Sequence, residues 1–147
     1  MGMSFGGNLI TQIKQLSGRL FERMLLENGI RAFNSAQSHI LHVLWQNDDI
    51  SVHDVSVETG LAMASLSGML DRMEKGGLIQ RRRDRKDRRK VRVTLTESAK
   101  ALHKDYAKLL VQLQDIYYDG FSSQEIEQLE QYLQRILHNV ESALHND

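Results

Sequence analysis

The residues with the clearest chemical capability lie between Arg81 and Arg92, where nine of twelve positions are Lys or Arg and two are Asp. The whole chain has 19 basic and 19 acidic residues, so this segment concentrates a local charge of +7 in an otherwise neutral sequence. Clustered cations bind phosphate oxygens and release the counterions that a polyanion condenses. A merely solvated turn would reduce this self-repulsion by mixing charge signs, so the segment predicts contact with a polyanion, most simply double-stranded DNA.

Two carboxylates interrupt the basic segment at Asp84 and Asp87. Asp87 precedes Arg89 by two residues, a spacing that lets its carboxylate pair with the guanidinium and fix its direction. An arginine held in this way suits the narrow minor groove of DNA. The candidate DNA contacts of this segment are Arg83, Arg85, Lys86, Asp87, Arg88 and Arg89.

The residue types that catalysis requires are sparse. The chain has no Cys, which excludes disulfides and thiolate chemistry, and it has neither a glycine-rich phosphate loop nor a Gly-x-Ser-x-Gly or His-Glu-x-x-His motif. His39 and His42 are three residues apart and share one side of a helix, where His103 or Glu22 could complete a zinc site. The favoured interpretation is that these histidines are partly buried or line a cleft. We therefore predict no enzyme, no cofactor and no bound metal.

The basic segment needs elements that hold it, and the sequence on both sides predicts two strands. Residues 78–82 have strand character, and Val91, Val93 and Leu95 alternate with polar residues, which leaves residues 83–89 as a hairpin tip. Capping signals predict helices that begin after Asn34 and after Ser51. A further helix over residues 61–75 ends at Gly76-Gly77. Short helices followed by strand, loop and strand are typical of a winged helix–turn–helix.

The helix over residues 61–75 has two different faces. Leu66, Leu70 and Met73 form the side that faces the core, with Met69 beside them. Small residues on the other side allow a close approach to base edges, the serines can donate or accept hydrogen bonds, and an arginine can reach guanine or phosphate. The candidate DNA contacts on this side are Met63, Ala64, Ser65, Ser67, Gly68 and Arg72.

Apolar stripes at helical spacing continue outside this region. They include Leu9, Ile13 and Leu16 in the first helix, a row from Leu102 to Ile116, and a row from Ile126 to Val140. A small winged domain cannot cover stripes of this length, so they predict a homodimer interface. The length of 147 residues and the 41% hydrophobic content predict a single domain, residues 1–147. The absence of a membrane span and of a secretory signal predicts a cytoplasmic protein with no membrane partner.

The chain resembles the MarR family of bacterial and archaeal transcription regulators. Asp87-Arg88-Arg89 followed by Val93 matches the family pattern Asp-x-Arg-x-x-x-Val, and further similarity lies in Gln37 to Trp45, Thr59-Gly60-Leu61, Leu70 to Ile79 and Leu95-Thr96-Glu97. The resemblance covers about residues 9–140. Two departures are visible, since Ala62 replaces the usual Ser or Thr cap and Arg85 replaces the usual proline of the wing.

The resemblance implies a mainly α protein with a small β-wing, in which residues 34–96 form the winged helix–turn–helix. Helices at about residues 9–28 and 97–145 would make an obligate dimer. Such a dimer would bind a pseudo-palindromic operator, most often as a repressor, and a small aromatic or anionic effector would release it. Two alternatives remain: a non-specific architectural DNA binder, and a dimeric interaction module whose basic wing docks an acidic protein.

Overall fold

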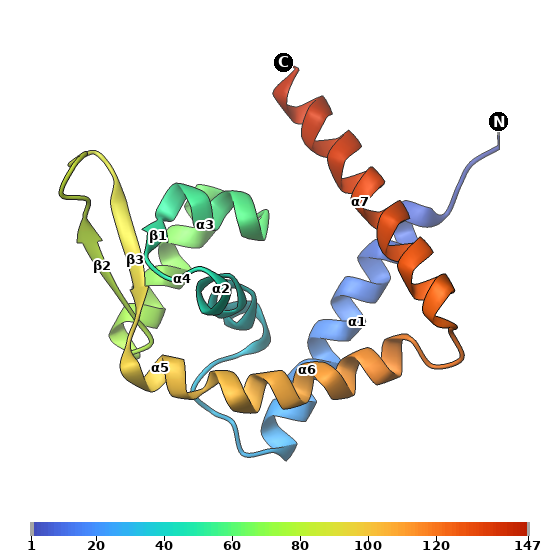
Figure 1. Ribbon diagram of the computed structural model, residues 1–147, viewed down its shortest axis with the longest axis horizontal. Coiled ribbons are helices and arrows are strands. Elements are labelled where there is room, and N and C mark those ends of the chain that lie inside the picture. The colour runs from blue at the N-terminus through green and yellow to red at the C-terminus, as the bar shows by residue number, and fades with distance from the viewer. Residues whose placement is uncertain (1, 147) are drawn as a thin grey trace. The chain divides into compact units, whose positions relative to one another are not determined.

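The computed structural model describes residues 2–146, and within them it contains seven helices and three strands. The chain divides into two compact units, one ending at Leu109 and one beginning at Leu110. Figure 1 colours the chain from its N-terminus to its C-terminus. The first unit holds α1 (Gly6–Glu27), α2 (Ser35–Gln46), α3 (Val52–Thr59), α4 (Met63–Lys75), α5 (Glu97–Ala101) and the sheet. Helix α6 (His103–Tyr117) spans the boundary, and α7 (Ser123–His145) belongs to the second unit.

Helices α2 and α3 begin at the predicted caps. The Asn34 side chain accepts a hydrogen bond from the Gln37 amide at 2.8 Å, and the Gln37 side chain accepts one from the Asn34 amide at 3.1 Å. The Ser51 hydroxyl accepts from the Asp54 amide at 3.0 Å at the start of α3. That helix ends at Gly60, whose φ of 74° lies in the left-handed region that glycine adopts without strain.

Helix α4 starts at Met63 rather than at the predicted Leu61. Leu61 belongs to the turn after α3, because its amide donates to the Thr59 hydroxyl at 3.2 Å and its carbonyl accepts from the Ser56 hydroxyl at 2.7 Å. Ala62 is extended, with φ −66° and ψ 146°, and its methyl group offers no hydrogen-bond acceptor to the first turn. The departure from a Ser or Thr cap therefore leaves α4 with a less satisfied start.

The sheet is antiparallel with the order β1-β3-β2, where β1 is Ile50–Ser51, β2 is Ile79–Arg83 and β3 is Val91–Leu95. Strands β2 and β3 form the wing, residues 79–95, with Arg82 opposite Arg92, and its tip is residues 84–90. The predicted hairpin is confirmed with its first strand shifted by one residue. The sequence did not predict β1, because a strand of two residues shows no alternation.

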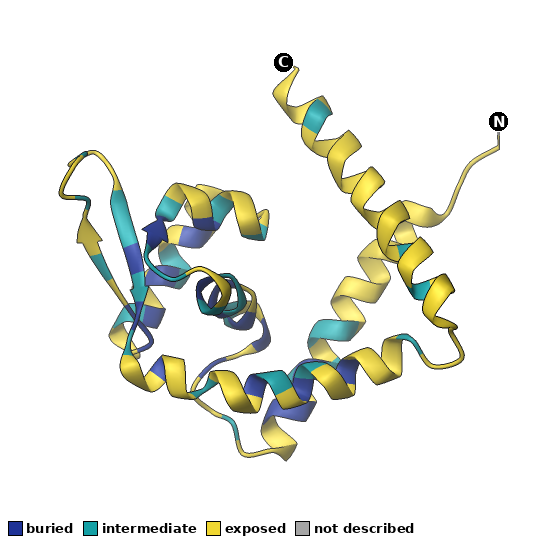
Figure 2. Cartoon of the chain, in the orientation of Figure 1, coloured by how far each residue is buried: buried dark blue, intermediate teal, exposed yellow. Residues whose placement is uncertain are grey.

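The core of the first unit lies where α2, α4 and the sheet meet (Figure 2). Leu66, Leu70 and Met73 of α4 are buried as predicted, while Met69 is half-buried. Helix α1 buries Phe21, Met24 and Leu25 in its second half. The capping box predicted for α7 is present between Ser122 and Glu125. Within residues 2–146, no helix combines the length and the apolar character that crossing a membrane requires.

Candidate nucleic-acid interface

The exposed side of α4 carries the six residues that the sequence predicts to contact DNA. Met63, Ala64, Ser65, Ser67 and Arg72 are exposed, and Gly68 is half-exposed. The Arg72 guanidinium lies over Gly68, where an added Cβ would meet it at 3.6 Å. We call these six residues the exposed α4 face. It combines small side chains, two hydroxyl groups and one exposed cation, which together permit close contact with a polar surface.

Arg89 lies in the tip of the wing, and its side chain is oriented by the neighbouring Asp87. Its Nε donates to Asp87 Oδ1 at 3.0 Å and a terminal nitrogen donates to Oδ2 at 3.1 Å, while its amide also donates to Oδ1 at 3.1 Å. These bonds lower the pKa of Asp87 and raise the pKa of Arg89, so both groups stay charged. The Arg89 side chain is nevertheless 89% exposed. The expected pairing is confirmed, and it produces an arginine with a fixed direction that remains open to a ligand.

The Asp84 carboxylate stabilises the turn at the tip of the wing by accepting backbone hydrogen bonds. It accepts hydrogen bonds from the amides of Lys86 at 2.7 Å and Asp87 at 3.1 Å, and these amides are the main reason that its pKa is lowered. Its other oxygen accepts from Arg92 at 3.0 Å. The turn so formed leaves Arg85, Lys86 and Arg88 exposed. Arg83, one residue before the tip, donates to the Arg88 carbonyl at 2.8 Å.

The base of the wing differs from its tip because carboxylates from other elements pair with its arginines. Arg81 contacts Asp71 and Glu74 of α4 at 2.5 and 3.0 Å. Arg82 and Arg92 both contact Asp49 at 2.8 Å. These three carboxylates reduce the charge of the segment from +7 to +4 and leave the excess at the tip. Sequence reasoning missed this compensation, since the partners lie between 7 and 43 residues away along the chain.

The two predicted groups of contacts meet at one hollow. It has a volume of about 330 Å³ and lies between the start of α3, α4 and the wing. Met63 and Ser67 of the exposed α4 face line it together with Arg89 and Lys90 of the tip. The fold therefore brings residues that are more than twenty positions apart in sequence to a common surface of positive charge.

The histidines lie away from this surface and in different surroundings. His42 Nδ1 is 3.1 Å from the Tyr106 hydroxyl, and the His103 ring packs against Trp45 with centroids 5.2 Å apart. His39 lines a separate cavity of about 490 Å³ with Glu22. Among residues 2–146, no three His, Cys, Asp or Glu side chains gather closely enough to hold a metal ion.

A model of the MarR family matches residues 33–91, which run from just before α2 to the first residue of β3. Residues 33–91 are a MarR family domain. The resemblance recognised in the sequence is therefore confirmed for the segment that contains the exposed α4 face and the wing tip.

Relatives of the MarR domain include an uncharacterized HTH-type transcriptional regulator, YfiV, of Bacillus subtilis strain 168. It is 36% identical over 66 residues, which are 45% of this chain and 41% of the relative. The match thus covers less than half of either protein.

Solved structures extend the similarity of the MarR domain along the chain. A MarR transcriptional regulator from Methanosarcina mazei Go1 has a TM-score of 0.82 and 23% identity, covering 95% of this chain and 98% of its own. A mutant E. coli MarR complexed with operator DNA has a TM-score of 0.78 and 24% identity, covering 92% and 99%. Streptococcus pneumoniae FabT in complex with DNA has a TM-score of 0.72 and 22% identity, covering 93% and 96%. At these identities the similarity shows a shared fold, and the predicted winged helix–turn–helix is confirmed.

Proposed function

We propose that this protein is a sequence-specific DNA-binding transcription regulator, a repressor that binds a pseudo-palindromic operator as a homodimer. The observation that carries the proposal is a hollow that Ser67 of the exposed α4 face and Arg89 of the wing tip both line. In this reading α4 enters the major groove, where Ser65, Ser67 and Arg72 contact base edges or phosphates. The wing tip follows the backbone and places Arg89 in the adjacent minor groove. Two relatives of the same fold, E. coli MarR and FabT, were solved with DNA, which supports this arrangement.

The proposed homodimer is supported by apolar side chains that are exposed in α1 and in α7. In α1, Leu9, Ile13 and Leu16 are between 53% and 58% exposed. In α7, all side chains are exposed or half-exposed, including Leu133, Ile136 and Val140. Rows of this length favour aggregation unless another surface covers them, and a second copy of the chain provides a matching one. Two α4 helices about 34 Å apart would then reach successive major grooves.

An effector would act through the cavity of about 490 Å³ in the first unit. Lys14 and Arg19 of α1 and His39 of α2 line it, and Leu61 and Met69 add apolar surface. This combination suits a small aromatic anion, since cations meet its charge and apolar groups meet its ring. Residues of the α3–α4 turn also belong to the lining, so a ligand there that prefers one position of α4 would shift the DNA-binding state.

The direct test of the proposed contact is Arg89→Ala. We expect this variant to lose at least about tenfold in affinity for a selected operator, because a positioned arginine in a groove contributes discrimination of this size. The homodimer and the thermal midpoint should change little, since the Arg89 side chain is almost fully exposed. Binding is measured by fluorescence anisotropy at near-physiological salt.

Arg31→Ala is the matched control, because it removes one exposed arginine from the loop between α1 and α2. Equal losses of operator affinity in both variants would mean that Arg89 contributes only its charge. That result would favour a non-specific architectural DNA binder. Unchanged DNA affinity in Arg89→Ala would contradict the proposed wing contact. Failure of the unaltered protein to bind any DNA would leave an acidic protein as the partner of the wing.

A further inference from the structure

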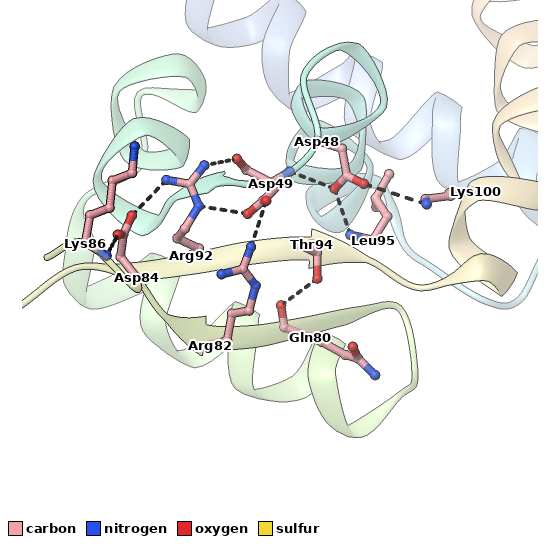
Figure 3. Close-up of polar contacts among 10 residues, drawn as sticks. All are labelled: Asp48, Asp49, Gln80, Arg82, Asp84, Lys86, Arg92, Thr94, Leu95 and Lys100. Carbon is pink, nitrogen blue, oxygen red and sulfur yellow. Dashed lines mark hydrogen bonds and ion pairs between the residues drawn. The ribbon is translucent and has the colours of Figure 1, made fainter. Parts of the chain in front are cut away.

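Asp49, in the loop after α2, pairs with arginines on both strands of the wing and is not itself one of the proposed DNA contacts (Figure 3). We propose that Asp49 is a specificity-determining residue: it withholds Arg82 from DNA phosphates and, through Arg92, positions Arg89 at the wing tip. The inference rests on the proposed function, because it concerns how the same wing distinguishes an operator from other DNA.

The first observation is that one carboxylate bridges both strands of the wing. Asp49 Oδ2 accepts from Arg82 on β2 at 2.8 Å, and Oδ1 accepts from Arg92 Nε on β3 at 2.8 Å. Arg92 also donates to the Asp49 carbonyl oxygen. Because Arg82 and Arg92 lie opposite each other in the strand register, the Asp49 carboxylate connects β2 and β3 at the same position along the wing. The hydrogen bond from Arg92 lowers the pKa of Asp49, so the bridge stays charged at neutral pH.

The second observation is the backbone that aims this carboxylate. Asp49 has φ 60°, in the left-handed region that few residues other than glycine, Asn and Asp adopt readily. Asp48 stabilises this turn, since its Oδ1 accepts from the amides of Asp49 and Leu95, each at 2.9 Å. Asp48 therefore ties the loop to the end of β3, and the chain turns so that the Asp49 side chain reaches the wing. A left-handed Asp whose two carboxylate oxygens each accept from a different arginine is a defined structural feature rather than a flexible loop end.

The third observation is a continuous series of polar contacts from Asp49 to Arg89. Arg92 lies between Asp49 and Asp84, with a 3.0 Å contact to the latter. Asp84 holds the amide of Asp87 at 3.1 Å, and Asp87 holds the Arg89 guanidinium. Each contact in the series involves a charged group, which makes it stronger than a hydrogen bond between neutral groups. A change at Asp49 is thereby transmitted to the direction of Arg89.

The fourth observation concerns the cation that Asp49 keeps occupied. The Arg82 side chain is 46% exposed and Asp49 is 41% exposed, so a released Arg82 would be open to solvent and to phosphate. Phosphate contacts add affinity for any sequence, whereas contacts of α4 and Arg89 depend on the groove that they enter. By neutralising Arg82, Asp49 lowers the affinity that all DNA shares and leaves the selective contacts dominant.

The test is Asp49→Asn, which keeps the size of the side chain and tolerates the left-handed backbone but removes the charge. Affinities are measured for the selected operator and for a random-sequence duplex of equal length, over a range of salt concentrations. We expect tighter binding to the random duplex, with a salt slope steeper by about 0.9 for the one added phosphate contact. We also expect weaker operator binding, so that the ratio of the two affinities falls about tenfold.

Asp48→Asn is the matched control, because it removes the same charge from the adjacent residue. Its amide oxygen still accepts from the Asp49 and Leu95 amides, so the affinity ratio should stay within about twofold of the original value. Adding Arg82→Gln to Asp49→Asn should return the random-duplex affinity and the salt slope to their original values without restoring operator affinity.

Three results would overturn the inference. Equal gains for both DNAs in Asp49→Asn would show a charge effect alone, and equal losses with a lower thermal midpoint would show a structural role alone. An unchanged ratio and slope would remove Asp49 from DNA recognition while the proposed function still held. Failure of the unaltered protein to prefer any DNA is the separate result that rejects the proposed function, and this inference with it.

Discussion

At the residue scale, carboxylates decide which arginines of the wing are available to a partner. Asp87 orients Arg89 and leaves its side chain 89% exposed, whereas Asp49, Asp71 and Glu74 neutralise arginines at the base. The Asp87–Arg89 pair was predictable because its members are two residues apart. The pairing of Asp49 with Arg82 and Arg92 was not, because it depends on a hairpin register and on one left-handed residue that no local pattern marks.

The histidines give a pH prediction at the same scale. Burial lowers the pKa of His39, with Lys14 and His42 adding to it, and burial with nearby His103 lowers the pKa of His42. The unfolded chain therefore binds protons more readily than the folded protein, so the free energy of unfolding falls as pH drops below about 6.5. Urea denaturation at pH 7.5 and 5.5 measures the effect, which should diminish in a variant with His39→Gln and His42→Gln.

The effect of His39 and His42 on stability can be distinguished from that of other titrating groups by its pH range and by a control variant. The carboxyl groups of Asp49, Asp84 and Asp87 have lowered pKa values, so their contribution to stability is lost only below about pH 4. His145→Gln, at an exposed position in α7, is the matched control. A denaturation midpoint that rises between pH 7.5 and 5.5 would contradict the account.

At the element scale, the helix ends were largely predictable because capping is a local matter. Asn34 with Gln37, Ser51 with Asp54, and Ser122 with Glu125 all make the bonds that their spacing indicates. Apolar periodicity predicts a start of α4 that is two residues early, because the pattern continues through Leu61 while the backbone of Leu61 belongs to the turn after α3. Strand β1 escaped prediction because Ile50 and Ser51 gain strand structure only by pairing with β3.

The uncapped start of α4 gives a stability prediction. In Ala62→Ser, the new hydroxyl can accept from the Ser65 amide, because Ala62 already has the extended backbone of an N-cap residue. We expect the free energy of unfolding to rise by about 0.5–2 kcal/mol, measured by urea denaturation. Ala64→Ser, at the second residue of α4, is the control and should give no increase in the free energy of unfolding. An equal change in both variants would mean that the cap is not what α4 lacks.

At the scale of the whole molecule, the exposed apolar rows on α1 and α7 predict an assembly. Ile136 is 46% exposed in the middle of α7, with Leu133 and Val140 within one turn on either side. We expect Ile136→Glu to shift the protein from dimer to monomer at micromolar concentration, because a carboxylate would be buried without a partner. Sedimentation velocity measures the change.

Gln134→Glu is the control for this substitution, since it adds the same charge to the polar side of α7, where Gln134 lies with Gln131 and Arg135. That variant should remain a dimer. A monomeric unaltered protein, or equal dissociation of both variants, would contradict the proposed interface.

The central proposal is that this protein, as a dimer, recognises DNA sequence with α4 and the wing. The most direct measurement is selection of binding sites from a random pool of double-stranded DNA with the purified protein at near-physiological salt. We expect enrichment of an inverted repeat whose half-sites are about one helical turn apart, as two α4 helices in successive major grooves require. Retention of DNA without enrichment of any sequence would contradict it.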